Sequence, residues 1–96
     1  MFNTNSNYSI EITPNIMNFD TLQKARKDLV GEITAVIDYD AHIHSTNDKQ
    51  AIKVWEHIKH EELAHIGELL ALLNYLDPDQ KQYVQKGFSE FFESQK

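Results

Sequence analysis

The sequence has no cysteine, and it contains only three glycines and two prolines among its 96 residues. Without cysteine, disulfide bridges and thiolate metal sites are both excluded. No apolar run approaches the roughly 18–20 residues that a membrane-spanning helix needs. The first residues have neither the basic start nor the apolar stretch of a secretory signal. These absences favour a cytoplasmic protein with no membrane partner.

The charge balance is acidic, with 15 Asp and Glu against nine Lys and Arg and a formal net charge of −6. The basic residues are scattered among acidic ones, so the basic patch of a nucleic-acid-binding protein is missing. Hydrophobic residues make up 41% and charged residues 25%, as in an ordinary folded domain. The length leaves room for one core. We therefore expect a single globular domain without a nucleic-acid partner.

Three boundaries in the sequence pattern divide the chain into an arm and three helical segments. Residues 1–19 are rich in Asn, Ser and Thr, which predicts a flexible N-terminal arm. Asp20 or Thr21 offers an N-cap for a helix over about residues 22–43. Residues 44–48 are polar and predict a turn that supplies the next N-cap.

The second half of the chain continues with a longer helix, expected over about residues 49–76. Asp77, Pro78 and Asp79 end it, because the residue before a proline avoids the helical conformation. Residues 79–93 have the apolar spacing of a short amphipathic helix. The expected fold class is all-α, with a domain over residues 20–96 made of an antiparallel two-helix hairpin and a short C-terminal helix.

Both long helices carry an apolar seam in which the residues are alternately three and four apart. Such seams pack helices against one another in bundles and coiled coils. The first seam is Leu22, Ala25, Leu29, Glu32, Val36, Tyr39 and Ile43, and the second is Trp55, Ile58, Glu62, His65, Leu69, Leu72 and Leu76. Charged or ionisable residues interrupt the seams only near the middle, at Glu32, Glu62 and His65. A buried carboxylate without a partner is costly, so these residues are expected to pair or to bind a metal.

The three interrupting residues are expected to meet at one level of the hairpin. If the chain folds back about residues 46–47, Glu32 faces position 61, next to Glu62 and one turn from His65. Residues three apart on a helix share a face, so Glu62 and His65 can bind one ion together. Carboxylate and imidazole ligands without sulfur suit Fe, Mn or Zn. Tyr39 lies two turns from Glu32 on the same seam, where it either packs in the core or supports the metal site.

These residues make half of a known kind of metal site. Ferritin-like di-iron and di-manganese bundles take a Glu from each of two helices and a Glu-x-x-His pair from each of two others. This chain has one such Glu and one such pair, so a second copy is expected to supply the rest. The expected active unit is a dimer that forms a ferritin-like four-helix bundle, with metal binding and dimerisation thermodynamically linked.

Two rival interpretations remain open, and a third is rejected. The site could hold a structural Zn or Mn ion, or the buried Glu and His could set pairing register in a metal-free helical interaction module. His60 and His65 are five residues apart, whereas a zinc protease motif needs a spacing of four, so that reading is rejected. His57, His60 and Glu61 are expected to be solvated, with an outer metal site as the alternative.

The sequence also resembles the encapsulated ferritin family over roughly residues 20–94. The resemblance rests on residues 32–40, EITAVIDYD, and residues 61–65, EELAH. It implies that Glu32, Glu62 and His65 are ligands of a ferroxidase centre, with Tyr39 nearby, and that the protein oxidises Fe(II) in iron storage or detoxification. It further implies dimers assembled into an open ring, commonly a decamer, inside an encapsulin shell.

The chain departs from this family in two places. Gly31 and Thr34 occupy positions where the family has acidic residues of an outer, metal-attracting site, so such a site is not expected here. The last residues, Phe91 to Lys96, do not resemble a shell-targeting peptide on a flexible tail. We therefore expect either a protein that works outside a shell or a longer native chain.

Overall fold

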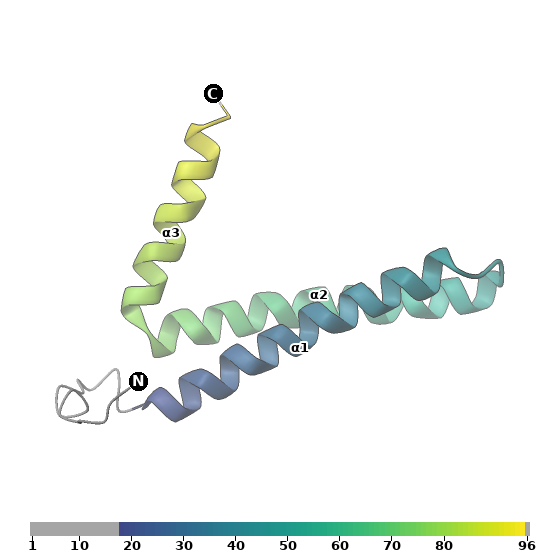
Figure 1. Cartoon of the computed structure of the whole chain (residues 1–96), viewed down its shortest axis with the longest axis horizontal. Helices are drawn as coiled ribbons and strands as arrows, with labels where there is room; N and C mark the ends of the chain where they lie inside the picture. Colours follow the sequence, from purple (N-terminus) through teal and green to yellow (C-terminus); the bar gives the residue numbers. More distant parts are fainter. Residues whose placement is uncertain (1–17, 96) are drawn as a thin grey trace, which may run out of the picture.

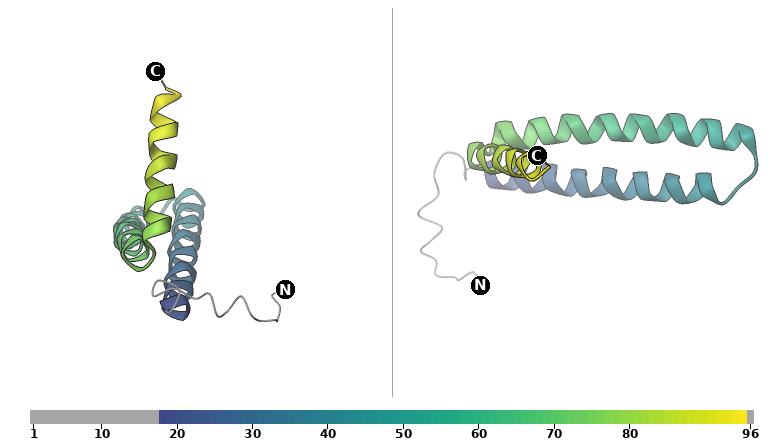
Figure 2. Two further views of the ribbon diagram at one scale, coloured as in Figure 1. Left: turned by 90° about the vertical axis from the view of Figure 1, so that its left-hand side faces the viewer. Right: turned by 90° about the horizontal axis from the view of Figure 1, so that it is seen from above.

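The computed structural model describes residues 18–95, and in that range the chain forms three α-helices and no strand. They are α1 (Phe19–His44), α2 (Lys49–Leu76) and α3 (Pro78–Glu93). Helices α1 and α2 lie side by side and antiparallel, and α3 leaves the open end of this hairpin at a steep angle (Figures 1 and 2). The predicted hairpin with a third helix is confirmed. No helix within residues 18–95 has the length and apolar character to cross a membrane.

Aspartate side chains begin α2 and α3. Asp48 accepts hydrogen bonds from the backbone N–H groups of Gln50 and Ala51 at 3.0 and 3.1 Å. Asp77 ends α2 and caps α3, since it accepts from the N–H groups of residues 79 and 80 at 3.1 and 3.2 Å. Pro78 follows at the first position of α3, where a backbone N–H would have no hydrogen-bond partner within the helix, so its absence costs nothing. The predicted ends of the hairpin helices at the central turn and at Asp77 are therefore correct.

The predicted start of α1 is wrong by a few residues. The helix begins at Phe19 with Asn18 as N-cap, which makes no side-chain cap hydrogen bond, so neither Asp20 nor Thr21 is the cap. Asp20 lies instead in the first turn, where its negative charge interacts favourably with the positive end of the helix dipole. It also forms an ion pair with Lys24 at 3.2 Å. The rest of the predicted arm, residues 1–17, lies outside the described residues, and its flexibility stays a prediction.

The core is small and lies at the end of the hairpin nearest α3. Within residues 18–95 the buried apolar side chains are Leu22, Ala25, Leu73 and Leu76. Leu73 is 1% exposed, whereas Leu72, which the predicted seam included, is 41% exposed. A bundle seam is wider than one helix–helix contact, because it serves two neighbouring helices. In the single hairpin, α1 covers only those residues of the α2 seam that face it. The neighbouring face of α2, which carries Leu72 and is called the open flank below, stays exposed.

The register of the hairpin is shifted by about one turn from the expected one. Glu32 contacts His65, where position 61 was expected to face it, and the rings of His42 and Trp55 also pair. The shift follows from the direction of helical side chains, which lean toward the N-terminus of their own helix. Side chains of α1 therefore lean away from the turn between the helices, and side chains of α2 lean toward it. As a result, the end of an α1 side chain meets an α2 residue that lies later in the sequence than the residue at the same backbone level.

Candidate metal centre

The structure brings Glu32, Glu62 and His65 together at the middle of the hairpin. His65 Nδ1 lies 3.0 Å from Glu62 Oε1 on the same helix and 3.3 Å from Glu32 Oε1 on the facing helix. One ligand atom from each of the three residues lies within 4.8 Å of the others. Among residues 18–95, no other group of three or more His, Asp or Glu side chains has the spacing of a metal site.

The three side chains are less buried than their seam positions predicted. The side chains of Glu32 and Glu62 are 26% and 20% exposed, and that of His65 is 50% exposed. The expectation of a fully buried level is therefore wrong for the single chain. His65 lies on the same flank of α2 as Leu72, which is seven residues further along, and none of the three described helices covers this flank. The ligand group consequently faces outward on one side.

An open concavity of about 450 Å³ adjoins the ligand group on this flank. Besides Glu32 and His65, its lining includes Asp28, Gly31 and Glu68. Apart from its own helix, no atom of residues 18–95 lies within 4 Å of the Cβ position of Gly31, so these residues leave the concavity open there. Neither Asp28 nor Glu68 belongs to the seams that the sequence analysis singled out. Their spacing could have identified them. Asp28 is four residues before Glu32, and Glu68 is three residues after His65, so each shares a helix face with a candidate ligand.

The two carboxylates change the acidity of the imidazole between them. The pKa of His65 is raised above its ordinary value, chiefly by the hydrogen bond to Glu32. Partial desolvation opposes this rise in pKa, and the hydrogen bond to Glu62 and the negative charges of both Glu residues add to it. A proton on Nδ1 thus lies between two carboxylates. Metal ligation requires a neutral imidazole, so a cation that binds here replaces this proton.

This coupling predicts a specific titration in metal-free protein. We expect NMR to give His65 a midpoint above the ordinary value of about 6.5. Glu32→Gln should lower the His65 midpoint more than Glu62→Gln, because the Glu32 hydrogen bond is the largest cause of the shift. Glu61→Gln, on the neighbouring exposed acid, serves as the control and should leave it unchanged. An unshifted His65 midpoint, or one insensitive to Glu32→Gln, would contradict the geometry.

The sign of the linked stability effect follows from the raised pKa. The folded metal-free chain binds the His65 proton more tightly than the unfolded chain does. The resulting stabilisation is complete below the unfolded-state pKa of His65 and is lost as the pH rises through the raised, folded-state pKa. Metal affinity has the opposite trend, because it falls as the pH drops below the raised pKa and protons compete for Nδ1.

Three aromatic rings contact one another in sequence between the ligand group and the turn. The ring of Tyr39 lies 6.1 Å from that of His42, which lies 5.0 Å from Trp55. Within residues 18–95, Tyr39 makes no hydrogen bond to the three candidate ligands. Its observed contact is therefore packing, and a supporting role at a metal site stays a prediction.

The other histidines of the hairpin lie apart from the ligand group. His57 Nε2 is 3.6 Å from Glu61 Oε2 one turn along α2, and both side chains are exposed. His60 is also exposed. His44 Nδ1 donates to the backbone carbonyl of Asp40 at 2.8 Å near the end of α1. In the part of the chain described, none of these side chains joins Glu32, Glu62 and His65.

The donor set fits a hard or borderline divalent cation. Two carboxylates and one imidazole suit Fe, Mn or Zn. Three protein ligands leave at least one coordination position open even for a four-coordinate ion, and more for iron. Water, an oxidant or ligands from another chain could reach such an ion from the outward-facing side of the group. The arrangement has the ligand types that each half of a two-metal carboxylate site contributes.

Comparison with known proteins agrees with this geometry. No protein-family model matches the chain. A ferritin-like–encapsulin shell fusion protein of Pyrococcus furiosus is 30% identical over 88 residues, which cover 84% of this chain. The chain spans only 26% of that longer protein. The crystal structure of the encapsulated ferritin domain from Pyrococcus furiosus superposes with a TM-score of 0.76 at 30% identity, covering 79% of this chain and 78% of that one. The chain therefore belongs to the encapsulated ferritin family.

Proposed function

We propose that the protein is a ferroxidase, which oxidises Fe(II) to Fe(III) at a di-iron centre formed between two copies of the chain. The observation that carries the proposal is the outward-facing group of Glu32, Glu62 and His65, whose ligand atoms lie within 4.8 Å of one another. A closed structural site would surround its ion, whereas this group leaves one side free. An open carboxylate site suits an ion that must enter, react and leave.

In this proposal iron is the substrate, and each residue has a defined task. His65 releases its proton and offers a neutral nitrogen to Fe(II), while the carboxylates of Glu32 and Glu62 neutralise the positive charge. An oxidant, oxygen or peroxide, takes one electron from each of two ions. Hard carboxylate oxygens favour the more highly charged Fe(III). The loss of electrons is therefore easier at this site than in water.

A second copy completes the ligand set. A two-fold axis beside the open flank would bring two Glu32, two Glu62 and two His65 side chains around two ions, as in other ferritin-like bundles. Leu72 is 41% exposed on the same flank as His65, and dimerisation would cover it. Covering the exposed part of this side chain would stabilise the dimer by about 1 kcal/mol. The flank that carries the ligands is thus suited to be the interface.

The names of two relatives support a proposal about where this activity takes place. One relative is named as a fusion to an encapsulin shell and the other as an encapsulated ferritin domain. We therefore propose that this protein handles iron together with an encapsulin shell, inside a cytoplasmic nanocompartment, in storage or detoxification. We propose further that its dimers assemble into a larger ring, such as the decamer that the family resemblance implies.

A second candidate function keeps the metal and drops the enzyme. Zinc also accepts imidazole nitrogen and carboxylate oxygen as ligands, so a Zn or Mn ion could tie the dimer together without redox chemistry. The distinguishing observation is the rate at which the protein oxidises iron. A metal-free helical interaction module is the third reading, and it predicts assembly that excess chelator leaves unchanged.

The experiment that separates these functions follows absorbance after Fe(II) is added to the metal-free protein in air. The ferroxidase proposal expects Fe(III) to form well above the buffer rate, and expects prior loading with Zn(II) to suppress that rate. Oxidation no faster than in buffer would reject the ferroxidase and favour the structural metal site.

A further inference from the structure

The packing of the hairpin differs between its two ends. The four buried apolar side chains within residues 18–95 all lie at the end next to α3. Between the candidate metal centre and the turn, the apolar seam side chains are only half-buried; they are Val36, Tyr39, Ile43, Trp55 and Ile58. Burial of apolar surface is the main force that holds two helices together. The hydrophobic contact between α1 and α2 is therefore weaker on the turn side.

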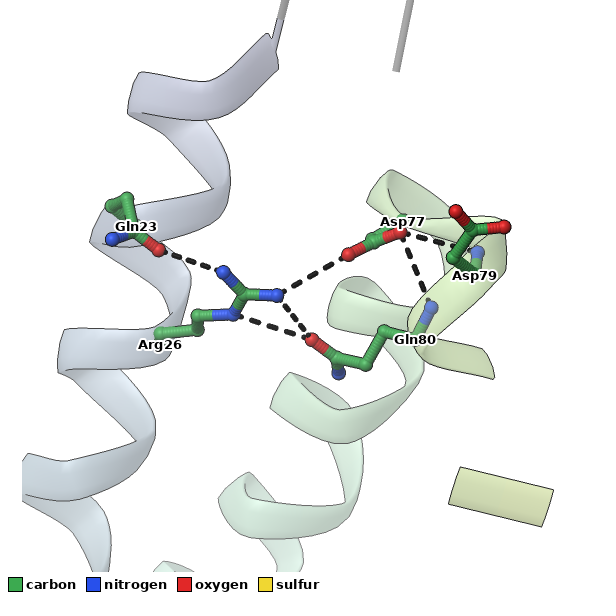
Figure 3. A network of polar contacts seen from close by, with 5 residues as sticks. All are labelled: Gln23, Arg26, Asp77, Asp79 and Gln80. Atoms are coloured by element: carbon green, nitrogen blue, oxygen red, sulfur yellow. Dashed lines mark hydrogen bonds and ion pairs between the residues drawn. The ribbon is translucent and has the colours of Figure 1, made fainter. Parts of the chain in front are cut away.

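The end next to α3 also has polar contacts between the helices. Arg26 on α1 donates to Asp77 Oδ2 at 3.2 Å and to Gln80 Oε1 at 2.8 and 3.3 Å. Gln23 accepts a further hydrogen bond from Arg26 at 2.8 Å. Figure 3 shows this network, which links α1 to the corner between α2 and α3. This end of the hairpin is therefore held both by buried apolar side chains and by hydrogen bonds.

On the turn side, an ion pair joins the two long helices. Lys59 Nζ on α2 donates to Asp40 Oδ1 on α1 at 2.9 Å. The lysine side chain is 25% exposed and the aspartate side chain 46%, so the pair is partly shielded from water. A hydrogen bond between two charged groups is shorter and stronger than one between neutral groups. The pair thus supplies a directed contact where the apolar side chains are only half-buried.

This ion pair lies beside the candidate ligands along both helices. Lys59 precedes Glu62 by three residues, which is about one turn on the same face of α2. Asp40 follows Glu32 by eight residues, roughly 12 Å along the axis of α1. Helical side chains lean toward the N-terminus of their helix, so the side chain of Asp40 leans from there toward the ligand group. The pair therefore connects α1 to α2 on the turn side of the candidate metal centre.

The separation of the two helices at this level decides whether all three ligands can reach one ion. Glu62 and His65 share a helix, so their spacing does not depend on α1. Glu32 lies on the other helix, with its Oε1 atom 3.3 Å from His65 Nδ1. Metal–ligand bonds to nitrogen and carboxylate oxygen are about 2.0–2.2 Å long. A functional site tolerates a displacement of only about 0.5 Å, so a small movement of α1 away from α2 would remove Glu32 from the ion.

We propose that Asp40 and Lys59 are positioning residues of the metal centre, whose ion pair holds α1 against α2 so that Glu32 reaches the ion bound by Glu62 and His65. Neither residue touches the ion. Partly exposed ion pairs add little to stability, so the expected effect is on metal binding, with only a small change in melting temperature. The inference rests on the metal centre of the proposed function, but it needs no oxidation of iron.

The opposite charges of the two residues separate positioning from simple electrostatics. Lys59→Met removes a positive charge near a cation site, so electrostatics alone would strengthen cation binding. Asp40→Asn removes a negative charge, so electrostatics alone would weaken it. Loss of positioning weakens binding in both variants. In the double variant the two charge effects oppose each other, whereas the broken contact is the same one as in each single variant.

The test titrates the metal-free protein with Co(II), whose visible absorption reports the arrangement of its ligands. We expect Asp40→Asn, Lys59→Met and the double variant each to bind Co(II) about three- to tenfold more weakly than the parent, less than the roughly 10–100-fold that loss of a ligand's direct partner costs. Lys59→Arg keeps a charged donor to Asp40 and should bind almost as the parent does. Lys24→Met breaks an exposed ion pair with Asp20 within α1, and as the matched control it should leave binding unchanged.

Two further measurements tie the result to the ion pair. Circular dichroism of the metal-free variants should show the helix content of the parent, and Lys59→Gln, also a good helix former, replaces Lys59→Met if that variant loses helix. A parent that binds Co(II) but oxidises Fe(II) no faster than buffer would reject the ferroxidase and leave the positioning role intact. The proposal would be overturned if the lysine variant bound Co(II) at least as tightly as the parent, if the double variant regained the parent's affinity, or if the parent bound no Co(II).

Discussion

Replacing Glu62 with glutamine should reduce Fe(II) oxidation to the buffer rate. Glutamine keeps the shape of the side chain but removes the negative charge that holds the cation, and Glu62 Oε1 lies only 3.0 Å from His65 Nδ1. Glu32→Gln and His65→Ala remove the other two members of the group and should have the same effect. The loss should exceed the roughly 10–100-fold that removal of an outer-shell partner costs a metal site.

Glu61→Gln provides the matched control for this series. Glu61 precedes Glu62 in sequence, carries the same charge and is exposed, but it pairs with His57 at 3.6 Å instead of joining the ligand group. The control should oxidise Fe(II) at nearly the parent rate, with overall charge changed equally. If all three ligand variants oxidised iron as fast as the parent, the ferroxidase proposal would have to be abandoned.

The second large effect expected is growth of the assembly when metal binds. Adding Zn(II) or, without air, Fe(II) should raise the particle mass above that of the chelated protein. The reason is that each chain supplies only half of the ligands, so ions bridge two copies. His65→Ala should abolish this increase, because His65 reaches both Glu32 and Glu62 at 3.3 and 3.0 Å.

Variants test whether the added mass depends on the ligand group. His65→Ala should leave association in chelator unchanged. Controls at His60, which is exposed on α2 outside the ligand group, should respond to metal as the parent does. Equal masses with and without metal would count against a centre formed between copies.

The parts of the fold that depend on local sequence could be predicted closely. Asp48 and the Asp77–Pro78 pair mark helix ends by capping and by backbone restriction, both of which act within a few residues. The meeting of Glu62 and His65 follows from a spacing of three on one helix. The start of α1 was missed because Asn18 makes no side-chain cap hydrogen bond, whereas Asp20 has the residue type of a cap.

Features that depend on long-range packing were less accessible. The seam count predicted that His65 and Leu72 face the core, and the single hairpin leaves both exposed, because the seam serves more than one neighbouring helix. The hairpin register needed the lean of side chains as well as the position of the turn. The contact between Arg26 on α1 and Gln80 on α3 joins residues 54 apart, so no local pattern could reveal it.

The central claim is that Glu32, Glu62 and His65 from two copies hold the metal ions together. A crystal structure of iron-soaked protein, with anomalous scattering recorded at the iron edge, tests this most directly. The account predicts two iron peaks between two hairpins, each touching carboxylate and imidazole groups from these three positions. Iron bound elsewhere on the chain, or held by one copy alone with no second chain beside it, would contradict the account.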